Sequence, residues 1–349
     1  MSAGQRRKLR TLFCTPNCIQ AHEKVCCPNS FGKSLSALVL RCLEVRIADA
    51  RFPSLRMRPT NWLPTASQTP LPPLVGTDGV IIRRVVSLEE YQECVQVQEE
   101  IWGPGFRELV PVAILLVAQK LGGICAAAFA PDGRMLGFVF GLTGIKDGEL
   151  AHWSDLLAVR SDARGAHIGE RLKHYQRALC IASGLPTMYW TFDPLVARNA
   201  HLNLMRLGAT ASEYVVNMYG NNTGSPLHGA VDTDRWVARW ELAATTTPPS
   251  PAAPHRDGVY VVRPSPTDGT PIEEAHPNAT VVRVAVPVDL ESLGVLQRTA
   301  WRNATRRAFM DHLGAGFDVI GFHRAHEGEP PFYELIAPAG FSHSSSTSS

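Results

Sequence analysis

The chain has 349 residues, of which 45% are hydrophobic and 19% charged, a composition ordinary for a globular protein. Its formal net charge of +2 is unevenly spread: the first 70 residues hold 11 Lys and Arg against three Asp and Glu, which leaves 23 basic and 29 acidic residues for the remainder. That mildly acidic remainder argues against a nucleic-acid-binding surface. No apolar run is long enough to span a bilayer and no secretory signal is recognisable, so we expect no membrane partner.

Cysteine usage points to a reducing compartment. After residue 42 the chain has only Cys94, Cys125 and Cys180, each inside an apolar pattern. Proteins that fold in an oxidising compartment more often carry paired cysteines at such lengths. We therefore predict a cytoplasmic location.

Residues 1–78 are predicted to be a disordered, basic N-terminal extension. They are rich in Arg, Ser and Pro, lack a sustained hydrophobic period and end in the linker-like run Pro64–Pro73. The pattern Cys14-x3-Cys18-x3-His22-x3-Cys26 has a spacing that zinc ligands can adopt, but such short patterns often arise by chance. We predict no metal, and whether this segment belongs to the natural protein is left open.

The first ordered elements are a strand and two helices. Val80–Val86 is rich in β-branched residues, and Ser87-Leu-Glu-Glu90 is a capping box that opens a helix ending near Trp102. A second helix is predicted from about Pro111 to Leu121, because Pro is tolerated in a first turn and the following Gly pair ends the pattern.

Three strands follow, joined by short polar turns. The Asp-Gly turn within Pro131–Gly133 separates two apolar runs, which is a strong hairpin signal, and a second turn lies at Lys146–Gly148. Because these connections are so short, antiparallel pairing is the economical interpretation. The predicted strands are Ile124–Ala130, Met135–Leu142 and Leu150–Val159.

The stretch after Val159 carries an anion-binding pattern. Helical spacing begins at Gly165, and one apolar stripe runs from Ile168 to Ala182 before Ser183-Gly184 ends the helix. A strand followed by a glycine-containing loop and a helix N-terminus collects unpaired N–H groups and the positive end of the helix dipole, which favours a phosphate. A tight strand–helix turn without any ligand is the alternative explanation of the glycines.

The loop has a recognisable counterpart. Arg164-Gly-Ala-His-Ile-Gly169 resembles the Arg/Gln-x-x-Gly-x-Gly/Ala motif of the Gcn5-related N-acetyltransferases, and the elements around it follow that family's order. The stretches Thr191–Ala209, Tyr214–Gly220 and Asp232–Trp236 further resemble a little-characterised bacterial branch of predicted acetyltransferases. The resemblance covers most of Val80–Ile336.

This resemblance implies an α/β (α+β) fold over residues 79–244, with a mixed, mostly antiparallel central sheet flanked by helices. A fifth strand, Thr187–Asp193, is expected to splay from strand Ala151–Val159 and open a slot for the pantetheine arm of acetyl-CoA, the co-substrate. The residues to which the resemblance gives cofactor contacts are Leu157, Ala158, Val159, Arg164, Gly165, Ala166, His167, Ile168, Gly169, Asn199 and Asn203.

His167 departs from the family pattern, which usually has Gly at that position. A side chain at the closest approach to the pyrophosphate either crowds it or donates a hydrogen bond to it. Asn199 and Asn203 also have a second interpretation, because they could cap the helix entered from Pro194.

The reaction implied is direct attack of a neutral amine on the thioester carbonyl, which needs a base for the ammonium proton and often an acid for the departing thiolate. In many relatives a Tyr is that acid, but alignment on Leu207-Gly208 puts Leu204 at its place. Tyr214 and Tyr219 are the candidates to replace it, although a thiolate can also leave without an acid. For the base we favour Asp155, which lies in the fourth strand near the expected thioester.

Asp193 and His152 are the alternative bases, and Asp193 could equally form a turn with the following Pro. Trp102, Phe106 and Arg107, in the loop between the first two helices, are expected to wall the acceptor side, and with Asp193 they are the predicted substrate residues. Arg107 could hold an acceptor carboxylate through a bidentate contact, but an exposed loop Arg is usually just solvated.

The C-terminal part is predicted to hold a linker over 245–280, a small β-α-β-β extension over 281–340 and a disordered tail over 341–349. A basic cluster lies on its helix, where a solvated face is the default explanation; its members are Arg302, Arg306 and Arg307. The predicted elements are strand Val281–Val288, helix Asp289–Leu313, and strands Phe317–Phe322 and Phe332–Ile336.

The function predicted is acetyl-CoA-dependent N-acetyl transfer to a primary amine of a small molecule. Two alternatives stay open: a non-catalytic acyl-CoA-binding or regulatory module on the same fold, and an acyltransferase that uses a longer acyl group. Fold alone does not choose among them. The acceptor is not fixed by the sequence, and a homodimer is compatible with it.

Overall fold

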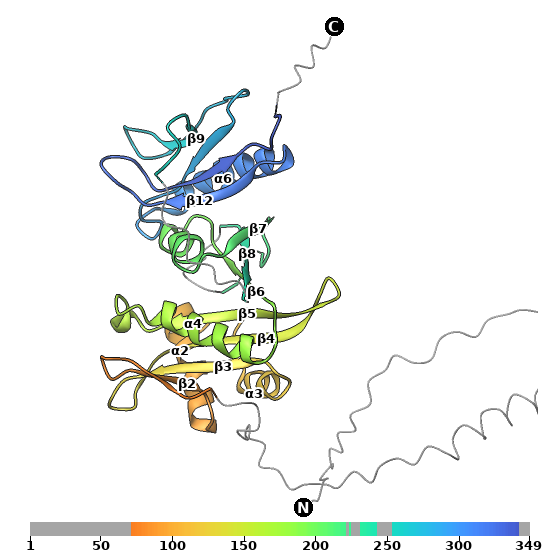
Figure 1. Cartoon of the computed structure of the whole chain (residues 1–349). Helices are drawn as coiled ribbons and strands as arrows, with labels where there is room; N and C mark the ends of the chain where they lie inside the picture. The colour runs from red at the N-terminus through yellow and green to blue at the C-terminus, as the bar shows by residue number, and fades with distance from the viewer. Residues whose placement is uncertain (1–70, 221–222, 225–230, 243–252, 342–349) are drawn as a thin grey trace, which may run out of the picture. The chain divides into compact units, whose positions relative to one another are not determined.

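The computed structural model describes residues 71–220, 223–224, 231–242 and 253–341, and the cysteine pattern between Cys14 and Cys26 lies outside them. The elements follow the predicted order (Figure 1). In chain order they are β1 Leu74–Val75, β2 Ile81–Arg84, α2 Leu88–Trp102, α3 Val112–Lys120, β3 Ile124–Phe129, β4 Met135–Lys146, β5 Glu149–Val159, a 3-10 turn Ser161–Ala163, α4 Ile168–Ala182, β6 Thr187–Phe192, α5 Ala197–Ala200, a π-helical turn His201–Arg206, β7 Thr210–Val215, β8 Arg235–Glu241, β9 Val259–Pro264, β10 Pro271–Glu273, β11 Val281–Ala285, α6 Val295–Gly314, β12 Asp318–His323 and β13 Phe332–Ile336.

The first sheet has eight strands in the order β1-β2-β3-β4-β5-β6-β8-β7. Every neighbouring pair is antiparallel except β5 and β6, which run parallel. The prediction of a mixed, mostly antiparallel sheet is therefore confirmed. The hairpins β3–β4 and β4–β5 form at the two predicted polar turns, because two-strand antiparallel pairing needs only such short connections.

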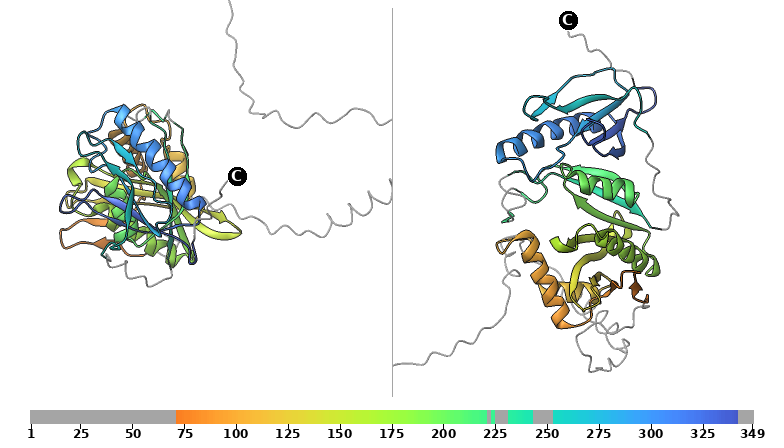
Figure 2. Two further views of the ribbon diagram at one scale, coloured as in Figure 1. Left: turned by 90° about the horizontal axis from the view of Figure 1, so that it is seen from above. Right: turned by 90° about the vertical axis from the view of Figure 1, so that its left-hand side faces the viewer.

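Helices cover both faces of this sheet: α4 lies on one side, and α2 and α3 lie on the other (Figures 1 and 2). Strand β3 is buried along its whole length for that reason. Its alternate residues belong to two different cores, with Ile124, Ala126 and Ala128 on the α4 side and Cys125, Ala127 and Phe129 on the other. The predicted capping box at Ser87 is present, since the Glu90 amide donates to its hydroxyl at 3.2 Å.

Order begins earlier than predicted. Strand β1 pairs with β2, and Asp78 accepts a hydrogen bond from Arg171 of α4 at 2.7 Å. The Arg171 contact joins residues far apart in sequence and β1 is only two residues long, so local periodicity gave no sign of either. The prediction of a disordered tail over 341–349 is also wrong at Phe341, whose ring packs on Phe317 with centroids 5.0 Å apart.

A second sheet of five strands, in the order β10-β9-β11-β13-β12, carries α6 on one face (Figure 2). Two of its strands, β9 and β10, lie where the sequence predicted a linker over 245–280, so that part of the prediction is wrong. Strand β9 pairs in parallel with β11, and this long-range pairing stabilises a segment whose local composition resembles a linker. Helix α6 begins six residues later than predicted, at Val295, because the Asp289 carboxylate binds the Glu291 amide in a turn.

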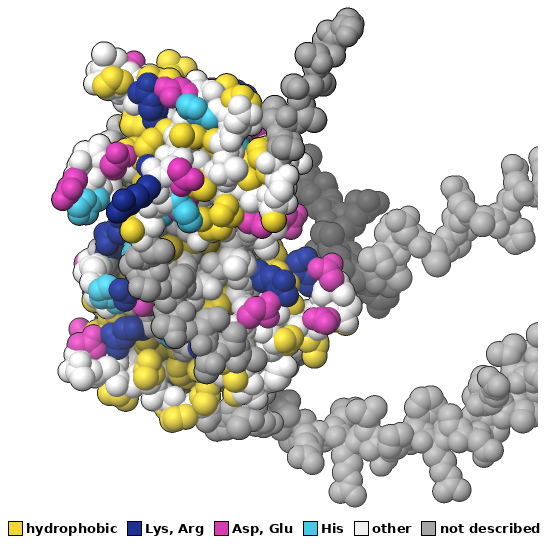
Figure 3. All heavy atoms as spheres, turned by 45° about the horizontal axis from the view of Figure 1, so that its top comes forward, with side chains coloured by type: hydrophobic (Ala, Val, Ile, Leu, Met, Phe, Trp, Pro, Cys, Tyr) yellow, Lys and Arg dark blue, Asp and Glu magenta, His cyan; other side chains and the backbone are white. Residues whose placement is uncertain are grey.

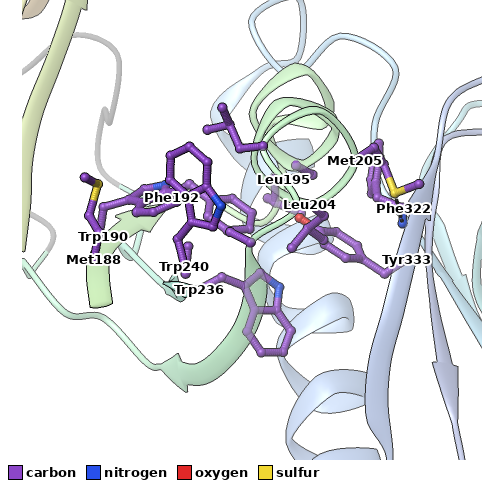
Figure 4. Packing of buried hydrophobic residues seen from close by; sticks show 14 of the residues in the cluster. Met188, Trp190, Phe192, Leu195, Leu204, Met205, Trp236, Trp240, Phe322 and Tyr333 are labelled. Carbon is purple, nitrogen blue, oxygen red and sulfur yellow. Dashed lines mark hydrogen bonds between the residues drawn. The ribbon is translucent and has the colours of Figure 1, made fainter. Parts of the chain in front are cut away.

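The two sheets share one hydrophobic core (Figure 4). Leu204 and Met205, from the helical segment after β6, meet Phe322 and Tyr333 of the second sheet, and Trp236 of β8 packs on Tyr333 with centroids 6.3 Å apart. None of the helices in the described ranges is long and apolar enough to cross a membrane. Acidic and basic side chains are interspersed over the face seen in Figure 3.

Candidate active site

The site forms where two parallel strands separate. Strands β5 and β6 pair over only three residue pairs, from Ala151–Thr187 to Trp153–Tyr189. Beyond this point β6 stays paired with β8, and β5 stays paired with β4. Ser154 and Trp190 are therefore the first residues past the last pair, and we call their position the vertex of the slot. The predicted splay of the fifth strand from the fourth is confirmed.

A β-bulge lies on β5 just beyond the vertex. Phe140 of β4 faces Leu156, whereas the next residue, Gly141, faces Ser154. Asp155 is thus the extra residue, and its main-chain groups are out of register with β4. Bulges of this kind re-aim a side chain and are frequent beside active sites. This places the favoured base at an irregularity that the sequence pattern did not reveal.

A pocket of about 380 Å³ fills the space between the separating strands. Its walls come from Ser154–Leu157 of β5, Trp190–Asp193 at the end of β6, the loop after α2, the helical segment after β6 and the turn before α6. The volume is in the range of small-molecule sites. Of the predicted site residues, those that line it are Trp102, Phe106, Asp155, Leu157, Asp193, Asn199, Asn203 and Tyr219.

Aromatic rings and carboxylates form the end of the pocket nearest α2. Trp102 and Phe106, which were predicted to wall the acceptor side, line this end, and their rings stack with centroids 5.3 Å apart. Arg107 is exposed and does not line the pocket; its amide donates to the Thr223 carbonyl at 2.9 Å, which fixes the loop. Glu108, which the sequence reasoning missed, lines the pocket beside Asp155.

Asp155 has the electrostatic environment of a proton acceptor. Burial among protein atoms, and then the neighbouring Glu108 carboxylate, raise the pKa of Asp155 above its ordinary value. Its side chain nevertheless remains open to the pocket. Across the pocket, the Tyr219 hydroxyl lies 3.1 Å from the Thr191 hydroxyl. Burial raises the pKa of Tyr219, and the Asp155 charge raises it further.

Tyr214 is not brought to the pocket. Its hydroxyl donates to the Asp234 carboxylate at 2.7 Å, and its ring packs between Trp236, at 5.0 Å, and Phe309, at 5.3 Å. Burial and the Asp234 charge raise the pKa of Tyr214. The sequence makes Tyr214 a candidate acid, but its contacts are those of a core residue that joins β7 to α6.

Asp193 lines the pocket, but both of its oxygens are engaged. One accepts from the Leu195 amide at 2.8 Å, and the other pairs with Arg302 at 2.7 Å and with Arg235 at 3.5 Å. Burial raises the pKa of Asp193, yet the two guanidinium groups outweigh it and the net pKa is lowered. An ionised, doubly paired carboxylate is a weak proton acceptor, so this residue anchors the strand end.

The basic cluster on α6 is not a solvated face, which corrects the sequence interpretation. Arg302 has only 3% of its side chain exposed, and Arg306 pairs with Asp232 at 2.9 Å and with Asp234 at 2.6 Å. Arg307 is exposed and pairs with Glu273 at 2.7 Å. The partners lie on elements far from α6 in sequence, so the helix pattern alone could not show them.

The predicted phosphate loop lies at the C-terminal end of β5, and does not line the pocket. Gly165 has φ 90° and His167 has φ 55°, so both adopt the left-handed conformation that favours Gly. Helix α4 begins at Ile168, three residues after its predicted start, and has no side-chain cap. Its first-turn N–H groups are therefore available, as an anion site requires. Ala158 and Val159 are packed in the cores on either side of the sheet.

Sequence reasoning missed the residue at the vertex, Lys173 of α4. Its side chain is buried and lines the pocket, and its Nζ donates to the Ser154 hydroxyl at 2.8 Å and lies 3.8 Å from the centre of the Trp190 ring. Asn203, predicted to contact the cofactor or cap a helix, accepts from the Trp190 indole at 3.0 Å. The available signal was the row Lys173, Gln176 and Cys180, which repeats beside the main apolar stripe at helical spacing.

His152, the alternative base, lies below the vertex and does not line the pocket. It is fully buried; Gln176 donates to its Nε2 at 3.0 Å, and its Nδ1 lies 3.2 Å from the Thr143 hydroxyl. Burial, with the charges of Lys173 and Arg84, lowers the pKa of His152 to about 3. The imidazole is therefore neutral at ordinary pH. Within the described residues, no cluster of three or more His, Cys, Asp or Glu is arranged to hold a metal ion.

Comparisons with known proteins give structural likenesses only: no protein-family model matches the chain, and neither does any curated protein. Ard1 from Thermoplasma volcanium matches 47% of this chain and 99% of its own at 13% identity, with a TM-score of 0.37. The yncA protein of Salmonella typhimurium, a putative acetyltransferase solved with acetyl-CoA, matches 50% of this chain and 99% of its own at 15% identity and a TM-score of 0.37.

Arabidopsis thaliana Naa50, solved with the bisubstrate analogue CoA-Ac-MVNAL, matches 46% of this chain and 98% of its own at 16% identity and a TM-score of 0.36. Because these TM-scores lie below 0.5, the fold is assigned from the chain's own elements: the strand–helix–helix–strand–strand–strand order, the glycine loop before α4, and the splay of β6 from β5. In these features the described part of the chain has the fold of the Gcn5-related N-acetyltransferases.

Proposed function

We propose that the chain transfers an acetyl group from acetyl-CoA to a primary amine of a small molecule. The observation that carries this proposal is the pocket of about 380 Å³ at the splay of β5 and β6, with the bulged Asp155 in its wall. A slot between separating strands leaves main-chain groups of β5 without a strand partner, and a thioester arm with amide groups can bind to them. The stacked Trp102 and Phe106 rings close the acceptor end.

The residues present suit acetyl-CoA. The uncapped N-terminus of α4 and the exposed segment 164–167 offer N–H groups to a pyrophosphate, and Gly165 has open space around its Cα. The loop follows the C-terminal end of β5, so an arm that starts at the loop runs back along β5 toward the vertex. Leu157 of β5 and Asn199 of the opposite wall border that path.

Asp155 is the proposed base. A neutral amine attacks the carbonyl carbon, and the nitrogen then carries a proton that the Asp155 carboxylate accepts. The raised pKa of Asp155 makes it a better acceptor than an exposed carboxylate. Tyr219, whose own pKa is raised, stays neutral and can hold the acceptor by a hydrogen bond through its hydroxyl. A main-chain amide at the bulge is suited to polarise the carbonyl.

Thermal unfolding with and without acetyl-CoA tests cofactor binding on the full chain. A ligand at about a hundred times its dissociation constant stabilises by roughly 2.7 kcal/mol, which is a readily measured shift. Arg164→Glu is expected to abolish the shift, whereas Arg256→Glu, a matched charge reversal at an exposed residue outside the pocket, is expected to retain it. No shift at saturating acetyl-CoA would contradict the proposal.

Turnover is the second test. Release of CoA is followed with a panel of small amines and, as a separate arm, short peptides with free N-termini, because the fold does not choose the acceptor. Asp155→Asn is expected to lower kcat about 10²- to 10³-fold while leaving the acetyl-CoA shift intact. Wild-type kcat/KM should rise with pH as Asp155 loses its proton. Binding without turnover in every arm would favour a non-catalytic acyl-CoA-binding module, and equal rates with longer acyl-CoAs would favour a broader acyltransferase.

A further inference from the structure

The most unusual charged group in the described chain is Lys173. It lies in the middle of α4, with 2% of its surface exposed, and no carboxylate of the described residues is within ion-pair distance. A Lys is almost never this buried without a paired charge. Replacing it by an apolar residue would suit the core better, so its presence calls for a role other than packing.

The hydrogen bonds beneath Lys173 run in one direction. Its Nζ donates to Ser154 Oγ at 2.8 Å, and Ser154 donates to Gln176 Oε1 at 2.8 Å. The Gln176 amide then donates to His152 Nε2, which leaves the His152 proton on Nδ1, 3.2 Å from the Thr143 hydroxyl. Thr143 in turn donates to the Gly122 carbonyl at 2.9 Å. Each acceptor in this series of hydrogen bonds already has a donor, so the series holds Nζ in place beside Ser154.

The walls around Nζ leave it one open direction. Trp190 lies under it at 3.8 Å and is held by Asn203, and the Met188 sulfur is 3.9 Å away on the β6 side. A protonated amine has three donors; the Ser154 hydroxyl accepts from one at 2.8 Å, and the Met188 sulfur accepts a weaker hydrogen bond from a second at 3.9 Å. Lys173 lines the pocket, so the remaining donor capacity faces the slot at its closed end.

We propose that Lys173 is the acid that protonates the sulfur of the departing thiolate in the acetyl transfer. This inference rests on the proposed function. An arm that enters from the loop at the C-terminal end of β5 has its thioester end nearest the vertex, where Nζ lies. The usual Tyr position is occupied by the buried Leu204, so the described fold supplies no hydroxyl there.

The amine nitrogen forms a bond to the carbonyl carbon, and the carbon–sulfur bond breaks with its electron pair on sulfur. The Asp155 carboxylate takes a proton from the nitrogen, and the Lys173 ammonium gives a proton to the sulfur, which leaves as the thiol. Solvent then returns a proton to Lys173 and removes one from Asp155, so the net products are the amide and free CoA.

Acid strength favours this direction of transfer. Burial lowers the pKa of Lys173 to about 7, below the ~8.5 of an ordinary thiol. The titratable groups coupled to it are Cys180 on α4 and His152 on β5; the burial of both keeps them neutral near that pH, and β6 presents only Met188 and Trp190. Tyr219 is a poorer donor, because burial and the Asp155 charge raise its pKa.

The first test needs no acceptor. CoA is bound to the full-length wild type, to Lys173→Met and to Lys146→Met, and the pKa of the bound thiol is read from the ultraviolet absorbance of the thiolate. Lys146 is an exposed hairpin residue outside the pocket and serves as the matched control. Because the bound thiol and Lys173 titrate as a coupled pair, the thiolate absorbance of wild type and Lys146→Met is expected to rise in two steps, the first at a pH below the pKa of free CoA, whereas that of Lys173→Met should rise in one step near the free value.

The second test is kinetic. Lys173→Met is expected to lower kcat about a hundredfold or more while acetyl-CoA still shifts the unfolding midpoint, and Lys146→Met is expected to match wild type. Wild-type kcat should fall as the pH rises through the Lys173 pKa, and this alkaline limb should be absent from Lys173→Met. If Lys173 had only a structural role, Lys173→Met would change neither the alkaline limb of kcat nor the thiolate titration of bound CoA.

The two proposals fail differently. If wild type does not bind acetyl-CoA or CoA, the proposed function fails and this inference falls with it. If wild type binds CoA but Lys173→Met gives the same thiolate titration as wild type, Lys173 is not the acid and the proposed function survives. Folding of the variant is checked by its own midpoint, which is expected to exceed that of wild type near pH 7. The difference should narrow between about pH 7 and 10.5, where the unfolded chain holds the Lys173 proton and the folded chain does not.

Discussion

His167 shows how one residue can depart from a motif and keep its geometry. Its backbone is left-handed, with φ 55° and ψ 21°, and 70% of its side chain is exposed. Glycine adopts this conformation freely, but His is among the few other residues that are enriched there. The loop therefore keeps the shape that the family's glycine provides, while the imidazole extends to solvent, 3.4 Å from Glu170.

Substitutions at His167 separate backbone shape from side-chain chemistry. His167→Gly is expected to leave acetyl-CoA affinity unchanged or tighter, because the loop keeps its conformation. His167→Val is expected to weaken affinity and to destabilise the fold by about 1–2 kcal/mol, since a β-branched residue is strained at positive φ. Calorimetric titration and thermal unfolding measure both effects. A loss of affinity in the Gly variant would instead mean that the imidazole contacts the ligand.

At the scale of elements, one ion pair joins the end of β6 to α6. Asp193 and Arg302 are 2.7 Å apart, and Arg302 is almost completely buried. Arg306 of the same helix pairs with Asp234, the residue just before β8. In addition, the Tyr333 hydroxyl of β13 donates to the Pro194 carbonyl at 2.9 Å. These polar contacts lie beside the shared apolar core, so the second sheet fixes the strand end that borders the pocket.

A double-mutant cycle on this pair measures the link. Arg302→Met is expected to lower the free energy of unfolding by about 3–5 kcal/mol, because the buried Asp193 charge loses its shorter ion pair and keeps only the one with Arg235 at 3.5 Å. Asp193→Asn should also destabilise, and the double variant should lose less than the sum. Urea unfolding provides the values; additivity of the two losses would rule out the coupling.

The pH dependence of the same pair has a definite sign. Because the two guanidinium groups hold the folded-state pKa of Asp193 below its ordinary value, the pair stabilises the fold above the ordinary Asp pKa. That contribution is lost as the pH falls through the lowered value. Asp193→Asn should therefore be closer to wild type in stability under acid than at neutral pH.

At the scale of the whole described chain, the core is continuous across both sheets. One buried cluster contains Met188 and Trp240 of the first sheet together with Val282 and Phe309 of the second part. The apolar surface of either part would be exposed if the other were absent, and exposing it would be strongly unfavourable. We therefore expect the first sheet to require the second in order to fold.

Calorimetry tests this dependence. The folded chain is expected to unfold in one transition, with equal calorimetric and van't Hoff enthalpies. A chain ending at Leu242 should lack a cooperative transition, because residues such as Trp236 lose their packing partners. Two resolved transitions in the full chain, or a cooperative transition in the shortened one, would show that the first sheet folds alone.

The sequence by itself determined the elements that have local signatures: the capping box at Ser87, the Asp-Gly hairpin at Pro131–Gly133, and the glycine loop before α4. These depend on hydrogen bonds and backbone preferences among neighbouring residues, so short patterns carry them. The family resemblance predicted the splay of the fifth strand. It also indicated Asp155, Asn203 and the aromatic pair Trp102 and Phe106 as site residues.

Only the tertiary structure decided which charged residues are solvated and which are not. Arg302 on a polar-looking helix and Lys173 beside an apolar stripe have the same local pattern as surface residues, yet both are buried by elements distant in the chain. Strand β9 escaped prediction for the same reason, since its parallel partner β11 is remote in sequence, whereas β1 and β10 are only two and three residues long. Burial and pairing of this kind depend on what the rest of the chain brings alongside, which no local pattern contains.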